Sequence, residues 1–122
     1  MTIQAFEHVQ LAMPRGREDE AIAFYRGVLG LHVVPKPEHL AVRGGCWFEN
    51  DSVKVHLGVT DDFVPAKKAH PAFLVADLNE FKSIFEQHGI EIVVDQPLEG
   101  FDRCYVHDPF GNRIELLQRV TP

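Results

Sequence analysis

Hydrophobic and polar residues follow one another with the period of a strand or a helix along most of the chain. Residues 6–12 predict a strand, and residues 18–29 carry apolar side chains at helical spacing and predict a helix that ends at Gly30. Three more strands are predicted at residues 31–34, 42–49 and 53–59, separated by the loop "PKPEHL" and the turn "NDS". The first half is therefore predicted to form a βαβββ module.

The same order of elements returns in the second half. A strand is predicted at residues 70–75, followed by a helix that Asp77 caps and Glu80 completes as a capping box. Gly89 ends this helix. The remaining strands are predicted at residues 91–94, 103–107 and 113–120. A second βαβββ module follows from this order.

The chain is thus predicted to be one α+β domain built from an internal repeat. Its parts are module one at about residues 3–60, a linker at about 61–69 that contains Pro65, and module two at about 70–120. His8 aligns with His70, 62 positions later, and His56 aligns with Glu115, 59 positions later. These pairs fall on the first and last strands of the two modules.

The four aligned polar residues share one environment. Side chains alternate between the two faces of a strand. The apolar neighbours of His8, His56, His70 and Glu115 would therefore pack against the helices, and these four polar side chains would lie on the other face. If the two halves form one curved sheet, the four polar side chains converge. Three imidazoles and one carboxylate suit a divalent ion such as Zn, Ni, Fe, Co or Mn, with positions left for water or substrate.

Two alternatives to this four-ligand site remain open. A site made of His8, His70 and Glu115 alone is chemically complete, and then His56 is not a ligand. Glu115 can also form a salt bridge without any metal, and its candidate partners are Arg43, Arg103 and Arg113. His32, His39 and His88 lie on predicted loops or element ends and are interpreted as ordinary surface residues.

The face that carries the candidate ligands predicts a small-molecule cavity. It also presents Phe6, Gln10, Leu74 and Leu117, which make an apolar lining with a few polar anchors. On the next strand Arg103, Tyr105 and His107 share one face. If that is the cavity face, Arg103 binds a substrate carboxylate, while Tyr105 and His107 exchange protons with the substrate; a solvated or salt-bridged strand face is the alternative.

Charge and composition exclude several classes of partner. The formal charge of -6 argues against nucleic acid, since Lys67-Lys68 is the only adjacent basic pair. No apolar run approaches a membrane span, and "MTIQAFEHVQ" lacks the regions of a signal peptide, so a cytoplasmic location is expected. In that reducing compartment, Cys46 and Cys104 are expected to be free thiols.

Five segments carry a family resemblance: "HVQLAMP", "AIAFYRGVLGL", "VHLGV", "HPAFLVADL" and, most specifically, "YVHDPFGNRIELL". With them the chain resembles the vicinal oxygen chelate superfamily of glyoxalases, bleomycin-resistance proteins, fosfomycin-resistance thiol transferases and extradiol dioxygenases. The resemblance implies paired βαβββ modules in a half-open barrel, a metal held at His8, His56, His70 and Glu115, and a homodimer. Tyr105 matches a tyrosine common in the transferases and dioxygenases, whereas lactoylglutathione lyases usually have Glu where this chain has His56.

The resulting hypothesis is a metal-dependent lyase or isomerase that chelates a small oxygen-rich substrate, with Glu115 and Tyr105 as catalytic residues and Arg103 and Gln10 binding substrate. Two kinds of alternative stay open. The chain could be a metal-free protein that binds and sequesters small molecules, as bleomycin-binding relatives do. It could also be a metal-dependent dioxygenase or thiol transferase, although "PLEGFDRCYVHD" lacks the serine-rich loop of the transferases.

Overall fold

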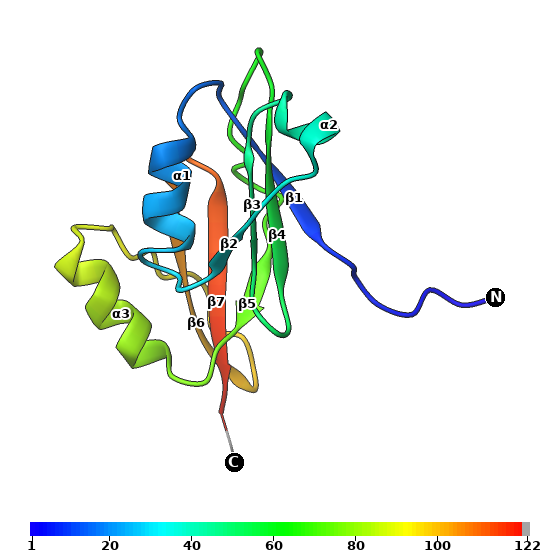
Figure 1. Ribbon diagram of the computed structural model, residues 1–122. Coiled ribbons are helices and arrows are strands. Elements are labelled where there is room, and N and C mark those ends of the chain that lie inside the picture. Colours follow the sequence, from blue (N-terminus) through cyan, green and yellow to red (C-terminus); the bar gives the residue numbers. More distant parts are fainter. Residues whose placement is uncertain (121–122) are drawn as a thin grey trace. The chain divides into compact units, whose positions relative to one another are not determined.

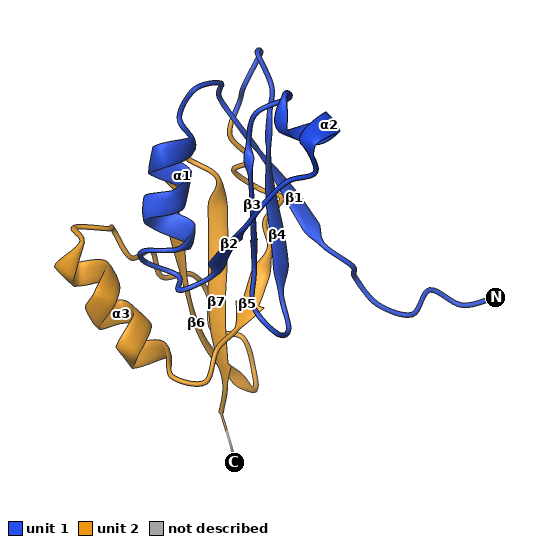
Figure 2. Ribbon diagram, viewed as in Figure 1, with its two compact units in different colours: residues 1–64 blue, residues 65–122 orange. Residues whose placement is uncertain are grey.

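The computed structural model describes residues 1–120 of the chain. It divides into two compact units, unit 1 at Met1–Val64 and unit 2 at Pro65–Pro122 (Figure 2). The boundary between them lies inside the stretch 61–69. Over the described part of the chain, no helix combines the length and the apolar character needed to cross a membrane. The cytoplasmic location stays a prediction.

Unit 1 is a four-stranded mixed sheet with one long helix (Figure 1). Its elements are β1 (Val9–Met13), α1 (Glu18–Tyr25), β2 (His32–Val34), α2 (Glu38–Ala41), β3 (Cys46–Glu49) and β4 (Lys54–Val59). The strand order is β1-β4-β3-β2, with β1 parallel to β4. The helix α1 contacts β3 and buries Phe24 and Tyr25, and Tyr25 stacks on Phe48 at 5.3 Å between ring centroids.

Unit 2 repeats this plan with three strands. Its elements are β5 (Ala72–Leu74), α3 (Leu78–Gln87), β6 (Phe101–His107) and β7 (Arg113–Arg119), in the strand order β5-β7-β6. The helix α3 begins as predicted, because the Asp77 side chain accepts a hydrogen bond from the Glu80 amide. It contacts β7 and buries Leu78 and Phe85. The α+β fold with two mixed sheets is confirmed.

Strand register confirms the internal repeat. In unit 1, β1 and β4 pair in parallel with Gln10 opposite His56. In unit 2, β5 and β7 pair in parallel with Ala72 opposite Glu115. The offsets of 62 and 59 residues carry the first pair onto the second (10 + 62 = 72, 56 + 59 = 115). His56 and Glu115 therefore occupy corresponding positions on corresponding strands.

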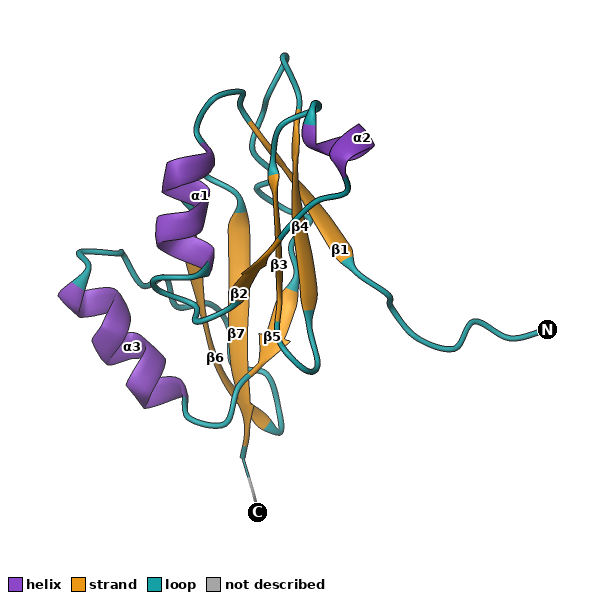
Figure 3. Cartoon of the chain, viewed as in Figure 1, coloured by secondary structure: helices purple, strands orange, loops and turns teal. Residues whose placement is uncertain are grey.

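Two predicted elements differ in the structure. The loop "PKPEHL" contains the short helix α2, and the strand predicted from residue 42 begins only at Cys46, because Gly44 and Gly45 adopt positive φ angles of 77° and 87°. The strand predicted at residues 91–94 is reduced to one bridge between Val93 and Tyr105, and this segment is drawn as a loop (Figure 3). Pro97 follows closely and cannot donate to a ladder.

The segment "DPFGN" forms the turn between β6 and β7. Asp108 and Asn112 are buried, and the Asp108 carboxylate accepts hydrogen bonds from the backbone amides of Phe110 and Asn112 and from the Asn112 side chain. The Asn112 side-chain oxygen in turn accepts from the Ala66 amide at 3.1 Å. This network fixes where β7 begins, and so fixes the position of Glu115 two residues further on.

Candidate functional site

The buried carboxylate of Glu115 is the centre of a polar cluster in unit 2. Its side chain is 7% exposed, and its Oε1 lies 2.8 Å from Nε2 of His70. His70 precedes β5, and Pro71 between them uses only its carbonyl, which accepts from the Glu115 amide at 3.0 Å. Pro71 thus lies just before an edge strand, where the missing amide of a proline is tolerated.

The orientation of His70 decides which ring nitrogen can bind a cation. Its Nδ1 lies 2.8 Å from the carbonyl oxygen of Lys68, and a carbonyl oxygen only accepts, so Nδ1 carries a proton. Nε2 is then the nitrogen that can offer a lone pair, and it points at Glu115. The contact between Nε2 and a carboxylate is attractive only with a proton or another cation between them.

Arg103 and Tyr105 complete the unit 2 cluster. Nη1 of Arg103 donates to the Tyr105 hydroxyl at 2.8 Å and lies 3.3 Å from Oε2 of Glu115. Burial, and secondly the negative charge of Glu115, raises the pKa of Tyr105, so its phenol retains the proton at neutral pH. Of the three arginines proposed as partners of Glu115, the one that pairs with it is Arg103.

The other polar residues near this cluster have different partners. Arg113 places its guanidinium 3.8 Å from the centroid of the Tyr105 ring and pairs with Asp95 at 3.3 Å. His107 pairs with Arg113 across the two strands and is exposed. Strand alternation left open which way Arg103 and Tyr105 face; the antiparallel register places Tyr105 directly opposite Glu115.

Unit 1 holds a stack of three rings at the corresponding place. The imidazoles of His8 and His56 stack with centroids 4.2 Å apart, and the indole of Trp47 stacks on the other side of His56, also at 4.2 Å. Register explains the second contact, because Trp47 lies directly opposite His56 in the β3–β4 pairing. Burial, and secondly the imidazole of His8, lowers the pKa of His56.

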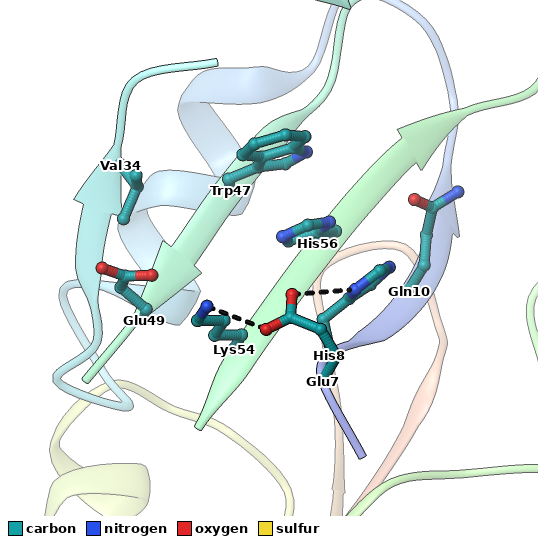
Figure 4. Close-up of a pocket in the computed structure, with 8 residues that line it drawn as sticks. All are labelled: Glu7, His8, Gln10, Val34, Trp47, Glu49, Lys54 and His56. Atoms are coloured by element: carbon teal, nitrogen blue, oxygen red, sulfur yellow. Dashed lines mark hydrogen bonds and ion pairs between the residues drawn. The ribbon is translucent and has the colours of Figure 1, made fainter. Parts of the chain in front are cut away.

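A pocket of about 380 Å³ opens over this stack (Figure 4). Besides the three rings, its lining is Glu7, Gln10, Val34, Glu49 and Lys54. Glu7 connects two sides of the pocket, since one oxygen lies 2.9 Å from Nζ of Lys54 and the other 3.4 Å from Nδ1 of His8. Gln10 lies beside His56 on the same face, as predicted.

The candidate ligands thus form two pairs, one in each unit. His8 and His56 are together in unit 1, and His70 and Glu115 are together in unit 2. Within residues 1–64, and equally within residues 65–120, no three histidine, cysteine or acidic side chains form a group that could hold a metal ion. Sequence reasoning missed Trp47 and Lys54; the contact of Trp47 with His56 depends on cross-strand register rather than on a motif.

The two pairs fit a metal ion to different degrees. Two donors bound at right angles to one ion, each about 2.1 Å away, lie about 3 Å apart, which is close to the 2.8 Å between His70 Nε2 and Glu115 Oε1. The rings of His8 and His56 instead stack face to face, within 19° of parallel and with centroids 4.2 Å apart.

Comparison with protein families identifies the chain. Residues 6–116 match the model of the Glyoxalase/Bleomycin resistance protein/Dioxygenase superfamily. The chain belongs to this superfamily. A solved structure of a Bacillus anthracis protein assigned to the glyoxalase family is 48% identical, with a TM-score of 0.94 and coverage of 98% of both chains.

Two further similar proteins were found. "Glyoxylase I 4" from Arabidopsis thaliana is 29% identical over 109 residues, which are 80% of this chain and 62% of the relative, so the match spans under two thirds of that protein. A variant of the fosfomycin resistance protein FosX from Listeria monocytogenes, solved with Mn(II) and 1S,2S-dihydroxypropylphosphonic acid, is 15% identical with a TM-score of 0.81 over 98% of this chain and 95% of that one. At that identity the likeness shows the fold alone.

Proposed function

We propose that this glyoxalase-superfamily chain is a divalent-metal-dependent lyase or isomerase that acts on a small oxygen-rich substrate by chelation and proton transfer. The observation that carries the proposal is the contact between His70 Nε2 and Glu115 Oε1 at 2.8 Å. A buried carboxylate facing an imidazole lone pair is stable only with a cation between them, and a metal ion supplies that charge.

His70, Glu115 and His8 are the proposed ligands, and His56 is the fourth candidate. This set draws on both units, from one chain or from two copies of it. When bound, a divalent ion supplies Lewis-acid stabilisation of negative charge that develops on a substrate oxygen. The donor set of two or three imidazoles and one carboxylate suits Zn, Ni, Fe, Co or Mn.

The surrounding residues would perform the remaining steps. Glu115 would accept a proton from the substrate carbon, and Tyr105, whose phenol stays protonated, would donate a hydrogen bond to the substrate oxygen. Gln10 lies on the pocket face beside His56 and would orient the substrate through its amide. Arg103 is the other predicted substrate-binding residue. A pocket of about 380 Å³ suits a small organic molecule.

Metal analysis of purified protein tests the proposal. The protein is purified without added ions, then loaded with Mn(II), because the structure of the FosX variant contains this ion. We expect one equivalent of metal in the wild-type protein, and none after Glu115→Ala or His8→Ala. Stoichiometric metal that neither substitution affects would reject the site.

The second candidate is a metal-free protein that binds and sequesters small molecules. It is favoured by the ion pair between Glu115 and Arg103, which neutralises the carboxylate without a metal, and by the aromatic lining of the pocket in unit 1. This candidate predicts tight binding of an aromatic or cationic molecule to protein stripped with a chelator. The enzyme hypothesis predicts that stripping abolishes turnover.

The reaction types within the metal-dependent class have separate co-substrates. A dioxygenase would consume O₂ with a catechol-like substrate, and a thiol transferase would need an added thiol. A lyase or isomerase would need neither. Screening the Mn(II)-loaded protein against dicarbonyl thioadducts, catechols and epoxides, with O₂ or thiol present and absent, separates these alternatives.

We also propose that the chain forms a homodimer. In each described sheet the first strand pairs on one side only, β1 with β4 and β5 with β7. Such edges expose backbone donors and acceptors that pairing with another strand would satisfy. Sedimentation is expected to give twice the mass of one 13.8 kDa chain, and a mass near 13.8 kDa would reject the dimer.

A further inference from the structure

We propose that Arg103 is a positioning residue that fixes the Glu115 carboxylate, so that Oε1 faces His70 and the cation while Oε2 is held by the guanidinium. The inference rests on the metal site proposed above and assigns Arg103 a role different from binding substrate. It also states how Glu115 binds the ion, through one oxygen rather than two.

The contacts of Arg103 lie on both sides of its guanidinium. On one side Nη1 donates to the Tyr105 hydroxyl at 2.8 Å and to Oε2 of Glu115 at 3.3 Å. On the other side Nε and Nη2 both donate to the backbone carbonyl of Gln96, at 3.2 and 2.6 Å. The arginine is therefore held by the protein itself, independently of Glu115.

A count of donors shows why substrate binding is the poorer assignment. A guanidinium has five N–H groups, and binding a carboxylate through two parallel hydrogen bonds needs two of them on one edge. Four are used: one by Tyr105, one by Glu115 and two by Gln96. The single N–H that remains cannot form the paired arrangement. The side chain is also only 17% exposed, which limits access by a substrate.

The two oxygens of Glu115 are thereby made different. Oε2 is 3.3 Å from Arg103, and Oε1 is 2.8 Å from His70. Arg103 is anchored to Gln96 and is fixed in register by pairing with Leu117 across β6 and β7. A carboxylate held in this way keeps Oε1 directed at the imidazole, and this fixed direction favours an ion bound by both groups.

Positive charge alone has the opposite effect. A guanidinium beside a ligand carboxylate repels the incoming ion, so an arginine that acted only through charge would weaken metal binding. Arg103→Lys separates the two effects, because it keeps the charge and removes the planar group that reaches Tyr105, Glu115 and Gln96 together. Arg103→Gln removes the charge as well.

The test is a titration with Mn(II) alone, followed by calorimetry or by the electron paramagnetic resonance of free Mn(II). We expect Arg103→Lys to weaken binding by about 10–100-fold, the range typical of residues that support a metal ligand. Arg103→Gln should also bind more weakly than wild type. The matched control is Arg113→Lys: Arg113 contacts Tyr105 and Asp95 instead of Glu115, and its substitution should leave the affinity near that of wild type.

The outcomes separate this inference from the proposed function. Wild-type protein that binds no Mn(II) rejects the metal site and the role of Arg103 with it. Wild-type protein that binds Mn(II) as tightly as Arg103→Lys rejects only the positioning role. A crystal structure of wild-type protein with Mn(II) gives an answer that does not depend on variants: Glu115 bound through Oε1 alone agrees with the inference, and binding through both oxygens overturns it.

Discussion

The two units place different chemistry on the same backbone positions. In unit 1, His56 on β4 is held between the rings of His8 and Trp47. In unit 2, Glu115 occupies the corresponding position on β7, and its neighbours are His70 and Tyr105. The strand registers are equivalent in the two units, so the difference lies in the side chains alone.

The same backbone thus carries stacked rings in unit 1 and a charged cluster in unit 2. The ring stack of unit 1 needs no counter-ion, because stacked aromatic rings gain from contact and desolvation. The buried carboxylate of unit 2 requires positive charge, and Arg103 provides it in the protein without metal. Unit 2 therefore carries the charged cluster, and unit 1 carries a pocket lined by stacked rings.

The largest effect is expected when the carboxylate is removed. Glu115→Gln should abolish Mn(II) binding, a loss beyond the ~10–100-fold that removing a supporting residue costs. His56→Ala, at the corresponding position of unit 1, should cause a smaller loss of binding, because the imidazole of His8, which stacks on His56, remains as a donor. Calorimetric titration of both variants measures the order, and a larger loss for His56→Ala would reverse the assignment of the two units.

The turns that precede β4 and β7 should differ in their contribution to stability. Asn112→Ala removes the buried side chain that accepts a hydrogen bond from the Ala66 amide and donates one to the Asp108 carboxylate. It should lower the free energy of unfolding by about 2–4 kcal/mol. Asn50→Ala removes the acceptor for Ser52 and Val53 in an exposed turn, where water replaces it, at a cost below about 1 kcal/mol. Urea unfolding measures both, and equal values would show that burial does not distinguish these turns.

Trp47 reports whether unit 1 takes part in the metal site. It is the only tryptophan in the chain, and it stacks on His56. If an ion held by His70 and Glu115 also binds an imidazole of unit 1, Co(II) should partly quench the tryptophan fluorescence of wild-type protein. Glu115→Gln should remove this quenching. Co(II) binding without any change in fluorescence would show that the ring stack lies outside the site.

The smallest expected effect concerns the two cysteines, which occupy corresponding places on β3 and β6, opposite Leu57 and Leu116. Burial raises the pKa of the Cys46 thiol from 9.0 to about 11 and raises that of Cys104 as well. Below pH 9 both thiols are protonated in the folded and unfolded chain, so they have no effect on stability. Between pH 9 and about 11 the unfolded chain loses protons that the folded chain keeps, so stability should fall as pH rises.

Urea unfolding at pH 8, 9.5 and 10.5 checks the role of the thiols. The doubly substituted protein, with Cys46→Ala and Cys104→Ala, should lose less stability over this range than wild type. An identical decline in the two proteins would assign the alkaline loss to other groups.

Strand alternation predicted only part of each half of the cluster. It placed Gln10 on the face of His56, whereas the position of Tyr105 opposite Glu115 comes from the antiparallel register of β6 and β7. The contact between His70 and Glu115 follows from the same rule and from the parallel pairing of the first and last strands of a module. The candidate ligands were therefore predicted mainly from the alignment of the two modules.

Other features depend on contacts that alternation does not encode. Arg113 has the same parity as Glu115, yet its guanidinium stacks on Tyr105 and pairs with Asp95, so Arg103 is the arginine that reaches the carboxylate. The segment after α3 is apolar enough to predict a strand, but it forms one bridge at Val93. Both outcomes are set by the loop at residues 95–100, whose path has no sequence period.

The most direct test of the central claim is the anomalous diffraction signal of a crystal grown with Mn(II). The account predicts one peak within about 2.3 Å of both His70 Nε2 and Glu115 Oε1, with Glu115 Oε2 still beside Arg103. The absence of a peak at Glu115 in crystals that contain Mn(II), with the carboxylate still paired to His70, would contradict it.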